Sequence, residues 1–164
     1  NRGTSDLGRT EVGSNVLLMA STHIAHDCLV GDNVILSNLA TLGGHVQIGN
    51  WAILGGGVLV HQFTQIGEHS LIGGGFRAVQ DVPPFMLADG SPAEVRSINK
   101  VGMERSGFLN DEIDVARGVF KKLYKGEMNR SQALEYLEKE FTSKDNDITK
   151  EIIAFAQSSD RGLA

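Results

Sequence analysis

Residues 24–47 read IAHDCL VGDNVI LSNLAT LGGHVQ, and the same pattern of six continues in both directions from this stretch. The first position of the six is aliphatic at every repeat: Val12, Leu18, Ile24, Val30, Leu36, Leu42, Ile48, Leu54, Val60, Ile66 and Ile72. A period of six does not fit the 3.6-residue repeat of an amphipathic helix, and simple strand alternation would not select it. It is typical of a parallel β-helix built from hexapeptides, each contributing one short strand and one corner.

The repeat also predicts what lies at each corner. Three hexapeptides close one triangular coil, so residues 18 apart should stack about 4.8 Å from each other. The small residue at the fifth position should fit a crowded corner, and Cys28 at such a position is predicted to be an inert core residue. Glycine is frequent at the second position, where we expect it to supply the positive φ of the turn.

The remainder of the chain divides at a pair of prolines. Pro83 and Pro84 cannot donate ladder hydrogen bonds, so we expect the left-handed β-helix over residues 1–84 and a connecting loop over 85–95. Residues 96–164 are richer in charge and should form a C-terminal α-helical domain. Residue types that cap helices occur at three places in it: Asn110-Asp111, Ser131 and Asp147.

Composition excludes several classes of protein. The chain of 164 residues has 15 Lys and Arg against 20 Asp and Glu, a net charge of −5 that argues against nucleic-acid binding over its whole surface. With one cysteine it cannot form an internal disulfide, which favours a reducing compartment, the cytoplasm. No apolar run approaches the roughly 20 residues of a transmembrane segment.

Four of the five histidines are expected to share one edge of the prism. The hexapeptides that begin at residues 24, 42 and 60 should stack, and they contain His26, His45 and His61. His23 lies at the adjoining corner. The 18-residue register places His26 over Gly44, and Gly44 over Gln62.

This cluster suits proton transfer from an alcohol at neutral pH. Histidine titrates near pH 6.5, so His26 is a candidate general base. Asp27 follows it and could orient the imidazole, although adjacent side chains of a strand point to opposite faces. The backbone N–H of Gly44 could stabilise an oxyanion in acyl transfer.

A metal site is the competing interpretation of the same histidines. Three histidines on stacked coils could hold zinc. However, the gamma-class carbonic anhydrases, a zinc family on this scaffold, have a second histidine five residues after the first. Here Gly31 and Ile66 stand five residues after His26 and His61, so we predict no resident metal.

Several motifs together resemble one family. They are His23-Ile24-Ala25-His26-Asp27-Cys28, Gly44-His45-Val46, Val60-His61-Gln62-Phe63, Gln80-Asp81-Val82-Pro83-Pro84, Asn1-Arg2-Gly3-Thr4 and Arg161-Gly162-Leu163. This set resembles the UDP-N-acetylglucosamine 3-O-acyltransferases of lipid A biosynthesis, without the coils that precede Asn-Arg-Gly-Thr in that family. The resemblance runs from end to end of the chain.

The resemblance implies a homotrimer of left-handed β-helices with active sites between subunits. The family transfers an (R)-3-hydroxyacyl chain from acyl carrier protein to the glucosamine 3-hydroxyl of UDP-GlcNAc. No cofactor is implied beyond the phosphopantetheine that carries the donor. Between Arg96 and Arg130 eight basic residues outnumber five acidic ones, which suits an acidic carrier protein.

The resemblance also implies residue roles. His26 matches the general base, and the N–H of Gly44 matches the oxyanion donor. The residues that match substrate-binding positions are His23, His45, His61, Gln62, Gly74, Asn99 and Arg105. Among these Gly74 matches the position that sets the depth of the acyl groove, so we expect a long chain.

Two other functions stay open at this point. One is a related hexapeptide transferase that uses acetyl-CoA, or the N-acyltransferase that acts later in the same pathway. The other is a trimeric fragment that binds acyl carrier protein without turnover.

Overall fold

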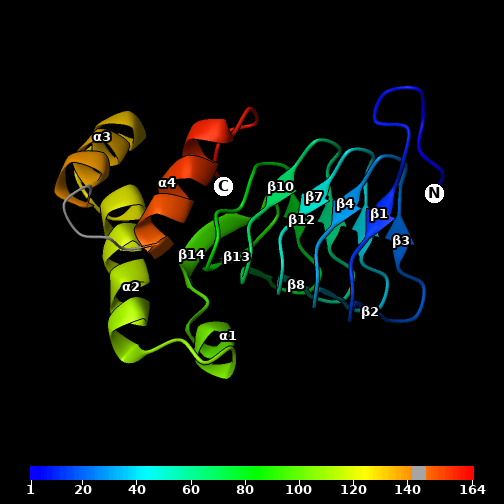
Figure 1. Ribbon diagram of the computed structural model, residues 1–164, viewed down its shortest axis with the longest axis horizontal. Helices are drawn as coiled ribbons and strands as arrows, with labels where there is room; N and C mark the ends of the chain where they lie inside the picture. Colours follow the sequence, from blue (N-terminus) through cyan, green and yellow to red (C-terminus); the bar gives the residue numbers. More distant parts are fainter. Residues whose placement is uncertain (142–146) are drawn as a thin grey trace.

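The structure is a computed structural model that describes residues 1–141 and 147–164. A stack of triangular coils forms the amino-terminal half, and the helices gather at the end of the stack that lies away from the amino terminus (Figure 1). The elements that carry the candidate site belong to the first coils of the stack.

Very short strands recur every six residues: β1 (Glu11–Val12), β2 (Leu17–Leu18), β3 (His23–Ile24), β4 (Leu29–Val30), β5 (Ile35–Leu36), β6 (Thr41–Leu42), β7 (Gln47–Ile48), β8 (Ile53–Leu54), β9 (Leu59–Val60), β10 (Gln65–Ile66), β11 (Leu71–Ile72) and β12 (Arg77–Ala78). They form parallel sheets in the orders β1-β4-β7-β10, β2-β5-β8-β11 and β3-β6-β9-β12. Each pairing joins residues 18 apart, as in Val12 with Val30 and Val30 with Ile48. The predicted period and register are confirmed, and the fold is a parallel β-solenoid.

The aliphatic first position fills the core. Leu36, Leu42 and Leu54 are fully buried, and so is the thiol-bearing Cys28. Val12 and Leu18, in the first coil, are 45% and 46% exposed. Full burial of an aliphatic side chain stabilises a fold by about 1.5–3 kcal/mol, so contacts between successive coils are the main source of stability.

The corners differ from the expectation about glycine. Positive φ recurs every six residues at the fourth position, mostly without glycine: Asn15, Ser21, Asp27, Asn33, Leu39, His45, Trp51, Gly57, Phe63, His69 and Gly75. From Asn33 onward the N–H of this residue donates to a carbonyl of the previous coil, as when the N–H of His45 donates to the carbonyl of His26 at 3.0 Å. Glycine at the second position instead permits close packing, since a Cβ on Gly43 would lie 2.8 Å from the backbone nitrogen of Gln62.

The segment 85–95, expected as a connecting loop, contains strand instead. β13 (Met86–Asp89) extends the second sheet parallel to β11, and β14 (Glu94–Ile98) pairs with it antiparallel. Met86, Ala88 and Val95 are buried, so an apolar face of this hairpin covers the last coil. The hairpin therefore joins the solenoid to the helices.

The helices are α1 (Lys100–Arg105), α2 (Asn110–Tyr124), α3 (Arg130–Phe141) and α4 (Asp147–Ser158). The start of α3 is capped by Asn129 rather than by Ser131, because the Asn129 Oδ1 accepts from the N–H of Gln132 at 3.0 Å. The Gln132 Oε1 in turn accepts from the N–H of Asn129 at 3.1 Å. Among the described residues, none of the helices has the length and apolar character needed to cross a bilayer.

The chain end returns to the solenoid through Asp81. This fully buried carboxylate accepts from the N–H of Gln65 at 2.7 Å and from the hydroxyl of Ser159 at 2.6 Å. Arg161 Nε donates to the carbonyl of Val79 at 3.0 Å. These bonds fix the segment after α4 beside the coils, where Arg161 lines the same hollow as His45.

Candidate active site

One corner of the solenoid brings together the predicted base and its neighbours. His26 and Asp27 form the turn between β3 and β4, and Gly44 and His45 form the same turn one coil later, after β6. The register of 18 therefore stacks Asp27 on His45 as well as His26 on Gly44. Phe63 continues the first column, and its ring stacks on that of His45 with centroids 4.5 Å apart.

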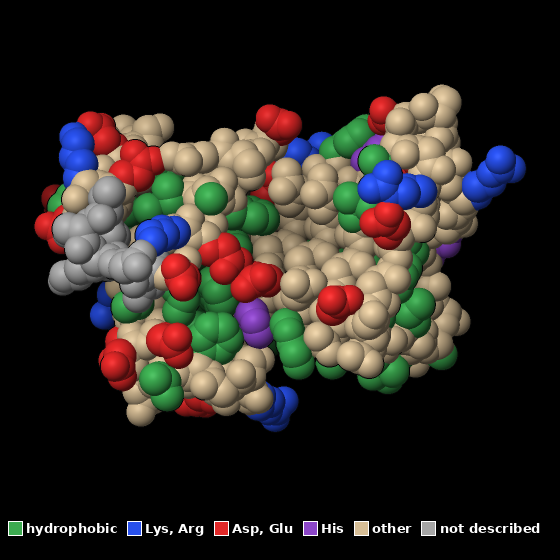
Figure 2. Space-filling model, viewed as in Figure 1, with side chains coloured by type: hydrophobic (Ala, Val, Ile, Leu, Met, Phe, Trp, Pro, Cys, Tyr) green, Lys and Arg blue, Asp and Glu red, His purple; other side chains and the backbone are tan. Residues whose placement is uncertain are grey.

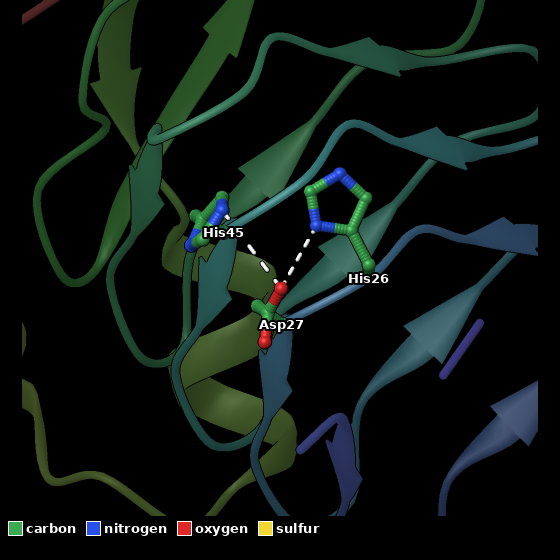
Figure 3. A group of neighbouring side chains, drawn as sticks. All are labelled: His26, Asp27 and His45. Carbon is green, nitrogen blue, oxygen red and sulfur yellow. Dashed lines mark hydrogen bonds and ion pairs between the residues drawn. The ribbon is translucent and has the colours of Figure 1, made fainter. Parts of the chain in front are cut away.

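His26 and Asp27 are hydrogen bonded to each other despite being adjacent. The Nδ1 of His26 lies 2.9 Å from the Oδ2 of Asp27 (Figure 3). The strand rule that placed these side chains on opposite faces does not apply, because they lie in a turn and Asp27 has a φ of 58°. Since Asp27 accepts from Nδ1, the Nε2 of His26 is the nitrogen left to take a proton.

The Asp27 carboxylate is buried and well supplied with donors. Its side chain is 0% exposed, whereas that of His26 is 42% exposed. The N–H of Thr4 lies 3.0 Å from each carboxylate oxygen, the Thr4 hydroxyl donates to Oδ2 at 2.6 Å, and the N–H of Gly8 donates to Oδ1 at 3.1 Å. Burial alone would raise the pKa of Asp27, but the hydrogen bonds from Thr4 and His26 outweigh it and lower the pKa to about 2.

This lowered pKa predicts an acid-sensitive contribution to stability. Because the pKa of Asp27 falls from 3.8 to about 2 on folding, its stabilising effect should be present above pH 3.8 and lost as the pH approaches 2. Urea unfolding of the wild type and of Asp27→Asn, at pH values above and below 3.8, measures this. The difference in unfolding free energy between the two should shrink at the lower pH; a constant difference would contradict the lowered pKa.

His45 completes the group around Asp27. Its ring lies edge-on to that of His26 with centroids 5.1 Å apart, and its Nε2 lies 3.9 Å from the Oδ2 of Asp27. Its Nδ1 lies 3.5 Å from a carboxylate oxygen of Asp6. His45 is therefore held between two acidic residues.

The same three side chains could offer ligands to a metal ion. One ligand atom from each of His26, Asp27 and His45 lies within 4.8 Å of the others. The Oδ2 of Asp27, however, already accepts from the Thr4 hydroxyl and from His26 Nδ1. A cation would have to displace the Nδ1 proton, so the arrangement fits a hydrogen-bonded acid–base pair better than a metal centre.

Gly44 provides both space and a free donor under the His26 ring. A Cβ at residue 44 would lie 2.6 Å from Cε1 and 2.7 Å from Nε2 of His26, so the ring packs directly on the glycine. The Gly44 carbonyl accepts from the N–H of Phe63 at 3.0 Å. Within residues 1–141 and 147–164, the Gly44 N–H has no hydrogen-bond acceptor, which leaves it available beside the His26 ring.

Of the other predicted residues, some lie at the same edge of the solenoid as His26 and some lie elsewhere. His23, His61 and Gln62 are exposed at the same edge as His26, and the Nδ1 of His61 lies 3.1 Å from the carbonyl of Gln62. Gly74 lies at a different corner, where its nearest neighbours belong to Gly55 and Gly56.

Asn99 and Arg105 are not brought to the His26 cluster within one chain. Asn99 is buried; its Nδ2 donates to the carbonyl of His69 at 2.8 Å and its Oδ1 accepts from the N–H of Gly102 at 3.1 Å. Its amide is thus engaged in capping α1. Arg105 lines a cavity of 410 Å³ with Trp51, over the second sheet.

Two further hollows open on the first sheet, the face seen in Figure 2. One, of 710 Å³, lies between the coils and α4, and its acidic lining residues are Glu11 and Glu68 from the coils and Glu151 from α4. Among these, Glu151 has its pKa raised to about 8 by burial and by the neighbouring Glu68. The other, of 620 Å³, is lined by Asp27, His45 and Arg161, and it is the one that adjoins the acid–base pair.

The sequence analysis missed three contributors to this corner. Thr4 and Arg161 were noted only for their resemblance to family motifs, and the ring of Phe63 had no assigned role. The stacking of Phe63 and Asp27 on His45 follows from the 18-residue register. The hydrogen bonds of Thr4 do not, because they come from a segment outside the repeat.

Two models of known protein families match parts of this chain. A family model described as UDP N-acetylglucosamine O-acyltransferase, Domain 2, matches residues 81–164. A model of bacterial transferase hexapeptide repeats matches residues 9–44.

Individual proteins match over most of the chain. An acyl-[acyl-carrier-protein]–UDP-N-acetylglucosamine O-acyltransferase of Burkholderia mallei is 44% identical over 160 residues, covering 96% of this chain and 61% of its own. One of Aliivibrio fischeri is 46% identical over 141 residues, covering 85% and 54%. This chain therefore spans about three fifths or less of the length of these relatives.

Solved structures of the same kind of enzyme superpose on nearly the whole of this chain. The UDP-N-acetylglucosamine acyltransferase of Bacteroides fragilis superposes with a TM-score of 0.95 at 36% identity, covering all of this chain and 64% of that one. The enzyme of Moraxella catarrhalis gives 0.92 at 38% identity, with 99% and 63% covered. Because the second-domain model alone matches more than half of its residues, the chain belongs to the UDP-N-acetylglucosamine O-acyltransferase family.

Proposed function

We propose that this chain carries the catalytic corner of an enzyme that transfers an (R)-3-hydroxyacyl group from acyl carrier protein to the glucosamine 3-hydroxyl of UDP-GlcNAc, the first step of lipid A synthesis. The observation that carries the proposal is the Nδ1 contact of His26 with Asp27 directly above the free N–H of Gly44. The relatives whose printed names state this chemistry support it.

The geometry suits each step of the transfer. The Nε2 of His26 takes the proton of the sugar hydroxyl as its oxygen attacks the thioester carbonyl carbon. The negative charge that forms on the carbonyl oxygen is met by the Gly44 N–H. When the tetrahedral intermediate collapses, the C–S bond breaks and the proton on His26 goes to the departing thiolate. Asp27 stays ionised and stabilises the imidazolium in between.

The acceptor and donor would be held by the surrounding residues. His23, His45, His61 and Gln62 flank the base and are assigned to the sugar nucleotide. Gly74, at its separate corner, is assigned to the acyl groove. No metal or other cofactor enters these steps, since the donor arrives on the phosphopantetheine of the carrier protein.

A homotrimer is part of the proposal. Arg105 lies over the second sheet, whereas His26 lies at the far end of the third. A substrate that touched both residues would have to bridge two subunits. Asn99 is assigned to the same distant side, where it positions α1 rather than exposing its amide.

The carrier protein is assigned to α2. Lys122 Nζ lies 4.5 Å from the ring centre of Tyr136, and Lys125 Nζ lies 5.8 Å from that of Phe120, so both ammonium groups rest on aromatic rings. Arg117, by contrast, is paired with Asp114. The positive charge offered to an acidic carrier therefore comes from the lysines.

A reducing compartment, the cytoplasm, suits the free thiol of Cys28.

The test is an acyl-transfer assay of the purified chain. It would be given UDP-GlcNAc and a panel of 3-hydroxyacyl carrier proteins of increasing chain length, with acetyl-CoA as the competing donor. The expected result is a 3-O-acylated sugar nucleotide, detected by mass spectrometry, from a long-chain carrier donor. Product from acetyl-CoA alone would favour the related acetyltransferase. Carrier binding without product from any donor would favour a non-catalytic trimer.

A further inference from the structure

The segment before the first strand wraps back over the active corner. The N–H of Asp27 donates to the hydroxyl of Thr10 at 2.9 Å, directly before β1. Earlier in the same segment, Thr4 and Gly8 both point hydrogen-bond donors at the Asp27 carboxylate. This segment lies outside the six-residue repeat, so its contacts with the corner are independent of the coil register.

Thr4 makes the closest of these contacts. Its hydroxyl lies 2.6 Å from the Oδ2 of Asp27, the same oxygen that lies 2.9 Å from the Nδ1 of His26. The hydroxyl oxygen also accepts from the N–H of Asp6 at 3.4 Å, which directs the Thr4 proton toward Asp27. Among the residues that the structure describes, Thr4 and His26 are the side chains that hydrogen bond to this oxygen.

The two side-chain contacts on Oδ2 act together. A carboxylate oxygen that is held by other donors presents its remaining lone pair in a fixed direction, and here that direction is toward Nδ1 of His26. Hydrogen bonds to the ionised form also keep the carboxylate charged, which favours the Nδ1–H tautomer of the imidazole. Loss of the Thr4 hydroxyl would remove the shortest hydrogen bond to Oδ2 and leave this oxygen with the Thr4 N–H and His26 Nδ1 as donors.

We propose that Thr4 is a positioning residue of the transferase: its hydroxyl and N–H orient Asp27 so that His26 keeps its proton on Nδ1 and offers Nε2 to the substrate hydroxyl. The inference rests on the proposed role of His26 as general base. Thr4 itself does not touch the reacting atoms. Its effect on the reaction passes through Asp27.

Three substitutions separate this role from a general loosening of the segment. Thr4→Val removes the hydroxyl while keeping the branched shape, Thr4→Ser keeps the hydroxyl, and Ser5→Ala removes a neighbouring exposed hydroxyl as a matched control. Since a hydrogen bond to a charged group is involved, kcat of Thr4→Val should fall roughly 10- to 100-fold, with KM within about twofold. Thr4→Ser and Ser5→Ala should remain close to the wild type. Equal losses in Thr4→Val and Ser5→Ala would overturn the proposal.

A double-mutant cycle shows whether the effect passes through Asp27. In the Asp27→Asn background, Thr4→Val should change kcat by no more than about twofold, because the carboxylate it orients is gone. The same loss in both backgrounds would mean that Thr4 acts by another route. Thr4→Ala, which removes the hydroxyl without adding a methyl group, is measured as well. A loss of kcat caused only by a steric clash of the new methyl group in Thr4→Val would be absent in Thr4→Ala.

Nitrogen-15 NMR of the histidines provides a readout that needs no turnover. In the wild type, His26 should be chiefly the Nδ1–H tautomer, and Thr4→Val should shift the population toward Nε2–H. Ser5→Ala should leave it unchanged. If the wild type makes no product but this shift occurs, the proposed function fails while the positioning role of Thr4 stands. An identical tautomer in the wild type and Thr4→Val would overturn the positioning role whatever the activity.

Discussion

Replacing His26 with alanine is expected to lower the rate of acyl transfer by roughly 10²- to 10⁴-fold, the range typical of a lost general base. The substrate hydroxyl would keep its proton as it attacks, and the leaving thiolate would lose its nearest acid. The unfolding temperature should change little, because the side chain is 42% exposed and lies outside the solenoid core. Steady-state turnover with a long-chain acyl donor measures the loss, and thermal unfolding followed by circular dichroism checks the fold.

His26→Gln is the matched variant. Glutamine keeps a donor that can reach Asp27 and much of the side-chain volume, but it cannot take up a proton at neutral pH. Its rate should therefore be as low as that of His26→Ala. Turnover within a few-fold of the wild type in His26→Gln would show that the side chain only fills space, and the assignment of the base would be wrong.

The repeat was sufficient to predict the solenoid and half of the site. A strict period of six leaves one way to bury Leu36, Leu54 and Ile72 in a single column, and that column fixes the register at 18. Once the register is fixed, the packing of His26 on Gly44 follows without any knowledge of side-chain conformation. The structure confirms that contact.

Features outside the repeat could not be predicted in the same way. The hairpin of β13 and β14 has only a few alternating apolar residues, and its Gly90-Ser91-Pro92 turn gave the stronger signal of a loop. Positive φ falls on residues such as Leu39 and Trp51 because the hydrogen bond to the previous coil determines the turn, which overrides local preference.

The pairing of His26 with Asp27 depended on that same unpredicted turn. Local alternation argued against it, and only the positive φ of Asp27 turns its carboxylate toward the ring. Asn99, which matches a substrate-binding position of the family, caps α1 in this chain, and the sequence pattern gave no sign of that contact. Long-range hydrogen bonds of single side chains leave no periodic trace in a sequence.

Gly44→Ala is expected to lower turnover roughly 100-fold or more while leaving the fold almost unchanged. Gly44 is not among the residues with positive φ, so its backbone accepts alanine. The new Cβ would instead lie 2.6 Å from Cε1 and 2.7 Å from Nε2 of His26. The ring is the mobile end of a partly exposed side chain, so it would swing outward and break its hydrogen bond with Asp27.

Because alanine keeps the backbone N–H of residue 44, this variant tests the position of the base and leaves the oxyanion donor in place. Gly67→Ala is the contrasting variant, since its Cβ would lie 2.3 Å from the backbone nitrogen of Pro84, which cannot swing aside. It should cost about 1–3 kcal/mol of stability, as overpacking does. Gly44→Ala should thus lose activity at nearly wild-type stability, and Gly67→Ala should lose stability first. Wild-type turnover in Gly44→Ala would mean that transfer does not require the His26 ring to rest on the coil below it.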